Sequence, residues 1–258
     1  MTDQKAVEAA NIEGQSDEIR SGDVVLPVMV YRPSHTAPVA AVILGTGGQQ
    51  KGMLRSVEWL ATRLAAAGIL ALTISWRDSS PLHDPEDIAL ATDWLLLQPD
   101  VDPARIGVYG MSRGGNAAFR AAAVDSRLRA VATFAPVTNF LQQAEGLAVY
   151  APSRHKMMVG WLGDPVKDRA FYENVQAITY AERVKQPVLI VHGLLDMVSP
   201  ADQSIWMKEA IEKGGNTQVR LELIHGMGHF GEVVPDSFGF EQIGKIIVPY
   251  FQEQLAAR

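Results

Sequence analysis

Apolar runs alternate with amphipathic stretches along most of the chain. Short, mainly apolar runs are typical of strands that a sheet buries on both faces, whereas apolar positions recurring every three or four residues are typical of helices. The predicted strands cover residues 40–44, 69–75, 106–109, 130–135, 188–192 and 218–224. The predicted helices cover residues 56–67, 84–97, 116–123, 201–213 and 240–255. Because helices separate the strands, the pattern predicts an α/β fold with a mostly parallel central sheet and helices on both faces.

The N-terminal part of the chain departs from this alternation. Residues 1–18 are mostly polar and charged, and we expect them to be poorly ordered or loosely docked. Residues 23–32 are predicted to form an edge strand, because Pro27 has no N–H to donate to a neighbouring strand. A single domain is therefore expected over residues 19–258.

A second departure lies between the strands at 130–135 and 188–192. Residues 137–184 are too long for a simple crossover and are rich in Met, Tyr, Trp and charged side chains. We interpret them as a small helical cap over the strand ends. The alternative is a surface excursion with no role in a site.

The sequence Gly-Met-Ser-Arg-Gly at residues 110–114 stands between a predicted strand and a predicted helix. A Gly-x-Ser-x-Gly motif in this position is typical of a nucleophile elbow, a sharp turn that holds Ser112 in a strained backbone conformation. Small residues two positions before and after the serine allow the strand and the helix to approach each other. The motif also occurs by chance in many proteins, but this placement favours a catalytic serine.

A serine hydroxyl is a weak nucleophile and requires an adjacent base. Asp196 follows the strand at 188–192, and His229 lies in a glycine-rich loop after the strand at 218–224. Carboxyl ends of parallel strands share one edge of a sheet, which is where open α/β sheets bind their ligands. The sequence therefore predicts a Ser112–Asp196–His229 triad, in the chain order that this elbow usually has.

Other residues compete for these roles. Asp202 follows Ser-Pro at the start of a helix, so we expect it to cap that helix. His225 ends a strand and is predicted to be a packed or hydrogen-bonded structural histidine. His192 is expected to stabilise the turn that leads to Asp196, as a buried and hydrogen-bonded core histidine. His225 and His229 do not form a metal motif, because the loop glycines between them do not place both rings on one helical face.

The oxyanion of an acyl-transfer reaction needs at least two hydrogen-bond donors. The backbone N–H of Arg113, directly after the nucleophile, is one candidate. The second should come from the loop at residues 45–48, with Gly47 as first choice and Thr46 as second; a phosphate-binding loop is disfavoured because no Lys-Ser/Thr pattern follows.

Candidate substrate contacts are less specific. Trp76 and Arg77 follow a core strand, and Met158 and Trp161 lie in the cap; all four are candidates for the pocket wall. Arg77 pairing with Asp78, and cap residues serving as core, are the alternatives. The side chain of Arg113 either holds an acidic substrate group or, more commonly for such a residue, pairs with a carboxylate.

The composition narrows the function classes. The chain has 258 residues and a formal net charge of −6, which argues against nucleic acid and against an anionic membrane as partners. It contains no cysteine, which excludes a disulfide, a thiolate zinc site and a catalytic thiol. No signal-like or membrane-spanning apolar run stands out, so a cytoplasmic location is the default expectation. Neither a cofactor nor a metal is implied, and the oligomeric state stays open.

Taken together, the segments at residues 102–108, 110–115, 192–200 and 228–230 resemble the α/β-hydrolase superfamily, and within it the dienelactone-hydrolase-like and prolyl-oligopeptidase-like branches. The resemblance implies the α/β-hydrolase fold and the roles of nucleophile, acid and base for Ser112, Asp196 and His229. Two departures matter. Gly45-Thr46 stands where these branches often have His-Gly, a loop closer to that of acyl-CoA thioesterases and acyltransferases, and the chain has no room for the propeller of the oligopeptidases.

We therefore expect a serine hydrolase that cleaves a small carboxylic ester through an acyl-enzyme. An acyl-CoA thioesterase or acyltransferase would need basic residues at the pocket mouth, for which Arg55, Arg77 and Arg154 are candidates. A small-peptide hydrolase would need an acidic anchor such as Glu145 or Glu173. A non-catalytic ligand-binding protein on a hydrolase scaffold is the alternative outside enzymes.

Overall fold

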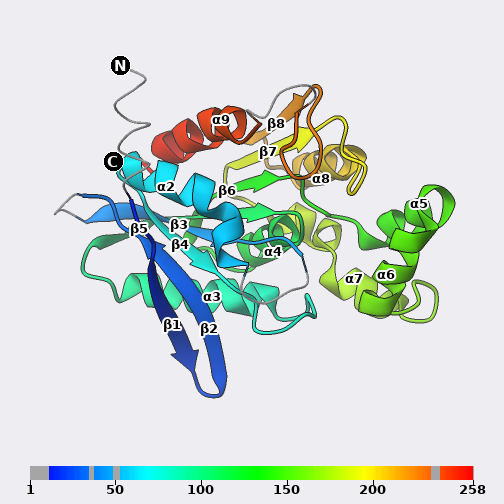
Figure 1. Ribbon diagram of the computed structural model, residues 1–258, viewed down its shortest axis with the longest axis horizontal. Coiled ribbons are helices and arrows are strands. Elements are labelled where there is room, and N and C mark those ends of the chain that lie inside the picture. Colours follow the sequence, from blue (N-terminus) through cyan, green and yellow to red (C-terminus); the bar gives the residue numbers. More distant parts are fainter. Residues whose placement is uncertain (1–11, 35–37, 49–52, 234–238, 258) are drawn as a thin grey trace.

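The computed structural model describes residues 12–34, 38–48, 53–233 and 239–257. Within them, one sheet has the strand order β1-β2-β4-β3-β5-β6-β7-β8, and every pairing from β4 to β8 is parallel (Figure 1). The strands are β1 (Gln15–Ser21), β2 (Val24–Tyr31), β3 (Val39–Gly45), β4 (Leu70–Ile74), β5 (Val101–Met111), β6 (Leu128–Phe134), β7 (Val188–Gly193) and β8 (Val219–Ile224). The predicted mostly parallel sheet is confirmed.

Helices cover both faces of this sheet, as the apolar pattern predicted. Their bounds are η1 (Leu54–Val57), α2 (Glu58–Ala66), α3 (Asp84–Leu96), α4 (Arg113–Ala122), α5 (Phe140–Tyr150), α6 (Pro152–Leu162), α7 (Arg169–Val175), η2 (Ala177–Arg183), α8 (Asp202–Lys213) and α9 (Gly239–Gln254). One apolar cluster joins the sheet to α3, α4 and α8, and a second joins it to α2 and α9. Each face is thus sealed from water by its own set of helices.

The expectation that residues 1–18 are poorly ordered or loosely docked is wrong for residues 15–18, which belong to a strand of the sheet. Residues 15–21 form β1, which pairs antiparallel with β2, while residues 1–11 lie outside the described residues. Strand β2 is consequently not at the edge, because β4 pairs with its other side. Pro27 is tolerated because it lies opposite Ser75, just beyond the last residue of β4, so its missing N–H removes no bond between the paired residues of β2 and β4. Its carbonyl accepts from Ser75 N at 3.1 Å.

Helices α5, α6 and α7 lie between β6 and β7 in the chain, within the segment expected to form a cap, and we call them the cap helices. Figure 1 shows them gathered at one end of the molecule, apart from the sheet. They have an apolar cluster of their own, which includes Phe140, Leu147, Met158 and Tyr172. No helix of the described residues is both long and apolar enough to cross a membrane.

Candidate active site

Ser112 occupies a tight turn between β5 and α4. Its φ of +54° and ψ of −115° are rare for a residue with a side chain, and the strain is held by packing on both sides. A Cβ on Gly110 would lie 1.9 Å from the carbonyl oxygen of Gly114, and a Cβ on Gly114 would lie 2.2 Å from that of Gly45. Only glycine fits at these two positions, so the motif supplies the close approach that the elbow requires.

The structure brings the three predicted triad residues together. The Nε2 atom of His229 lies 3.1 Å from Ser112 Oγ, and its Nδ1 atom lies 2.7 Å from Asp196 Oδ2. Asp196 follows β7 and His229 follows β8, and the two loops are joined by the bond from Leu195 N to Met227 O at 2.9 Å. A proton can therefore pass from the serine hydroxyl to an imidazole whose other nitrogen faces a carboxylate.

Asp196 is held as a carboxylate. Its Oδ1 accepts from the backbone N–H groups of Val198 and Ser199 at 2.8 and 2.7 Å. Burial by itself raises the pKa of Asp196, but hydrogen bonds from His192 and His229 outweigh that effect and hold the pKa well below its usual value. The charge that the imidazolium of His229 needs beside it is therefore present at neutral pH.

His192 is fully buried and is hydrogen-bonded, as expected. Its Nε2 lies 3.1 Å from Asp196 Oδ2 and 2.8 Å from the carbonyl oxygen of Ser199, and its Nδ1 lies 2.6 Å from Ser204 Oγ. Both neighbours of Nε2 are acceptors, so Nε2 carries the hydrogen and Nδ1 accepts from the Ser204 hydroxyl. His192 thus contacts the triad carboxylate directly, which its place in the sequence did not reveal.

His225 and Asp202, the alternatives to His229 and Asp196 for the roles of base and acid, do not lie at the triad. His225 is exposed; it follows β8, an edge strand in which only Ile224 is buried. Asp202 is exposed and is the first residue of α8, and the cap position before it is held by Ala201 instead.

Candidate oxyanion donors lie next to Ser112. Arg113 is the first residue of α4, so its N–H has no acceptor one turn earlier in the helix. Gly47 packs against the nucleophile: a Cβ there would lie 3.2 Å from Ser112 Cβ and 3.8 Å from Ser112 Oγ. The carbonyl of Thr46 accepts from Trp76 Nε1 at 3.1 Å, and this bond holds the loop that contains Gly47 in place.

The guanidinium of Arg113 is occupied. It donates to both oxygens of Asp84, at 2.9 and 2.7 Å, and both side chains are almost fully buried. It also donates to the carbonyls of Ser79 and Ser80. This pair answers the question that the sequence left open, because it leaves the Arg113 side chain no group for a substrate.

An apolar pocket opens beside Ser112 under the cap helices. Its volume is about 400 Å³, within the usual range for sites that bind small molecules. Its walls are Val137, Phe140, Gln143, Leu147, Arg154, Met157, Met158, Trp161, Val198 and Phe230, with Ser112 among them. Met158 and Trp161 lie here as predicted. Phe140 and Leu147 were missed, since their apolar positions on α5 look like those of any core-facing helix.

Trp76 and Arg77, which we expected on the pocket wall, do not line it. Trp76 is only 1% exposed and lies under the guanidinium of Arg113, 5.4 Å from ring centroid to carbon. Arg77 forms an ion pair with Asp87 of α3, not with the adjacent Asp78. Both residues support the loops around the site instead of forming its surface.

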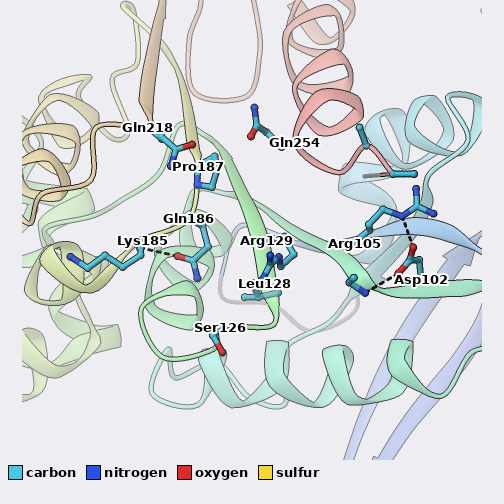
Figure 2. Close-up of a pocket in the computed structure, with 13 residues that line it drawn as sticks. Asp102, Arg105, Ser126, Leu128, Arg129, Lys185, Gln186, Pro187, Gln218 and Gln254 are labelled. Carbon is cyan, nitrogen blue, oxygen red and sulfur yellow. Dashed lines mark hydrogen bonds and ion pairs between the residues drawn. The ribbon is translucent and has the colours of Figure 1, made fainter.

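A second hollow of about 560 Å³ lies at the opposite edge of the sheet, around the amino ends of β5, β6 and β7. Figure 2 shows Arg105, Arg129, Lys185 and several glutamines around it. None of the predicted site residues lines this hollow. In open α/β sheets ligands bind at the carboxyl ends of the strands, where Ser112 lies, so the apolar pocket is the better candidate.

Comparisons with known proteins identify a family and relatives of this chain. The model of the prolyl oligopeptidase family matches residues 75–254. Thiohydrolase apmlB of Arthrinium phaeospermum is 34% identical over an alignment that covers 77% of this chain and 84% of that protein.

Two solved structures illustrate the likeness in fold. An acylaminoacyl peptidase of Pyrococcus horikoshii superposes with a TM-score of 0.82 at 18% identity, over 100% of this chain but 45% of that one. Est1E of Butyrivibrio proteoclasticus superposes with a TM-score of 0.75 at 18% identity, over 95% of this chain and 100% of that one. The chain therefore spans less than half of the peptidase and the whole length of Est1E.

Proposed function

This chain belongs to the prolyl oligopeptidase family, whose members are serine hydrolases with the α/β-hydrolase fold, and we propose that its own substrate is a small carboxylic ester, which it cleaves through an acyl-enzyme. The observation that carries the proposal is the 3.1 Å separation of Ser112 Oγ and His229 Nε2 on the wall of an apolar pocket. The substrate is a small molecule whose acyl or leaving group packs against the cap helices.

The proposed reaction begins when His229 Nε2 takes the Ser112 proton as Oγ attacks the ester carbonyl. Asp196 accepts from Nδ1, holds the ring in the required tautomer and stabilises the imidazolium. His229 then gives the proton to the departing alkoxide, which leaves the acyl group on Ser112. Water activated by His229 attacks the acyl-enzyme and restores the serine.

The tetrahedral oxyanion would be held by the N–H groups of Arg113 and Gly47. Both lie on segments that other contacts fix: α4 by the Arg113–Asp84 pair, and the loop by Trp76. Donors that are already in place need no reorganisation as charge develops, and each is worth roughly 2.7–4 kcal/mol of transition-state stabilisation.

The test compares the purified protein with the variant Ser112→Ala on p-nitrophenyl butyrate. We expect the parent protein to hydrolyse this ester and the variant to have a kcat lower by a factor of about 10⁴ or more, with an unchanged free energy of unfolding. A fluorophosphonate should form one covalent adduct, at Ser112. Full activity in the folded variant would overturn the proposed mechanism, and an unlabelled Ser112 would favour a non-catalytic binding protein.

A blocked peptide or amide is the second candidate substrate, and a thioester is the third. The likeness to an acylaminoacyl peptidase favours the blocked peptide or amide, and the thiohydrolase relative favours the thioester. The described pocket wall includes no carboxylate that could anchor a free amino terminus, which disfavours an aminopeptidase. Turnover of N-acetylalanine p-nitroanilide or S-butyryl-N-acetylcysteamine above that of the butyrate ester would replace the ester assignment.

A further inference from the structure

Arg154 is the one charged side chain among the described residues that form the wall of the apolar pocket. It lies in the first turn of α6 and is exposed. Its one hydrogen bond among the described residues of the chain runs from Nη1 to the carbonyl oxygen of Met197, at 3.3 Å. Met197 directly follows the triad aspartate in the chain. A guanidinium has five N–H donors, so most of its donors remain free to bind a ligand.

The other two arginines considered for the pocket mouth differ in this respect. Arg55 pairs with Glu58 and Arg77 pairs with Asp87. Arg154 forms no ion pair with any described carboxylate. Of the three candidates from the sequence, it alone combines a place on the pocket wall with an uncompensated charge.

We infer that Arg154 selects substrates that carry a carboxylate at the far end of an apolar stem. The inference rests on the proposed function and names its substrate class. The stem would pack against Phe140, Leu147 and Met158, while the scissile carbonyl lies at Ser112 and the carboxylate reaches the guanidinium. Arginine binds a carboxylate through two parallel N–H donors, which gives orientation as well as attraction.

The local charge supports this assignment. The sequence of α6, Pro-Ser-Arg-His-Lys-Met-Met-Val-Gly-Trp-Leu, contains basic residues and no acidic one. The chain as a whole has a net charge of −6, so α6, with Arg154 and Lys156, is a locally basic helix on a negative protein. A patch of one sign at the mouth of a low-dielectric pocket raises the local concentration of ligands of the other sign.

The experiment compares monomethyl adipate with dimethyl adipate, which differ in one terminal charge and little in size, by following acid release at constant pH. We expect a higher kcat/KM for the monoester. Arg154→Gln should lower kcat/KM for the monoester about tenfold more than for the diester, chiefly through KM, because the contact is made in ground and transition states alike. The monoester preference should also fall with added salt.

Further arms locate the charge and control for structure. 6-Acetoxyhexanoate carries the carboxylate on the leaving group, so its preference relative to methyl 6-acetoxyhexanoate tells which half of the ester faces Arg154. Arg154→Glu should reverse the preference between monoester and diester. Arg129 is an exposed arginine at the opposite edge of the sheet (Figure 2). Arg129→Gln is therefore the matched control and should leave kcat/KM unchanged for both substrates.

The outcomes separate this inference from the proposed function. Ser112-dependent hydrolysis of both adipates at equal kcat/KM, or an equal loss on both in Arg154→Gln, would overturn the inference and leave the hydrolase assignment standing. The second result would make Arg154 only a brace between α6 and the Met197 loop. Failure of p-nitrophenyl butyrate hydrolysis would overturn both.

Discussion

His192 and His229 contact the same oxygen of Asp196, at 3.1 and 2.7 Å. His192 is fixed in turn by Ser204 and by the carbonyl of Ser199. The carboxylate therefore has a fixed direction before any substrate binds. His192 acts through Asp196 and not on the substrate, so it is a positioning residue.

Replacing His192 should reduce turnover more than substrate binding. In His192→Ala, Asp196 loses one donor and the Ser204 hydroxyl loses its acceptor. We expect kcat on p-nitrophenyl butyrate to fall about tenfold to a hundredfold with little change in KM, and the free energy of unfolding to fall by about 1–3 kcal/mol. Ser204→Ala, which keeps the N–H donor to Asp196, is the control. An equal loss of kcat in both variants would make His192 a structural residue alone.

Acid should destabilise the protein partly through Asp196. Its pKa in the folded state lies below the usual value, so the unfolded chain binds the proton more readily. The stabilisation is complete above about pH 4 and is lost as pH falls below that value. Urea unfolding at a series of pH values should give a smaller acid-side loss for Asp196→Asn than for the parent protein. Parallel curves would contradict this role for the carboxylate.

Gly47 and Gly160 provide a matched pair of glycine substitutions. A Cβ on Gly47 would approach Ser112 Cβ to 3.2 Å, while a Cβ on Gly160 would have nothing within 4 Å. Gly47→Ala should lower kcat by about 10²-fold, since it displaces the nucleophile or a donor of the oxyanion. Gly160→Ala should keep activity and raise the free energy of unfolding by about 0.5–1 kcal/mol, because alanine suits the interior of α6 better. Equal kinetics in both variants would remove Gly47 from the site.

The Arg113–Asp84 pair should behave as a unit in stability measurements. Burial raises the pKa of Asp84 to about 6 even though Arg113 favours its charged form. Arg113→Met leaves this carboxylate without its partner and should cost about 3–5 kcal/mol. The double variant Arg113→Met/Asp84→Leu should cost less than the sum of the single changes. Additive losses in urea unfolding would show that the two side chains act independently.

The parts of the fold that local patterns specify were predictable. Buried strands and the helices between them produce distinct apolar periods, and the elbow is a local motif whose glycines fit one geometry. Asp196 and His229 followed from a topological rule, since both come directly after parallel strands. These features need no knowledge of which distant residues meet.

The parts that depend on distant contacts were not predictable. Strand β1 buries only Ile19, so no apolar alternation marks it. The partner of Arg113, Asp84, lies 29 residues away at the start of α3. Arg154 was one of three equivalent arginines until the ion pairs of Arg55 and Arg77 were visible.

The separate apolar cluster of the cap helices has an evolutionary consequence. It shares no buried residue with either cluster that holds the sheet. Substitutions at positions such as Phe140, Leu147 or Met158 therefore reshape the pocket without loosening the sheet that aligns Ser112, His229 and Asp196. A lineage with this architecture can drift from one substrate to another while its reaction chemistry stays the same.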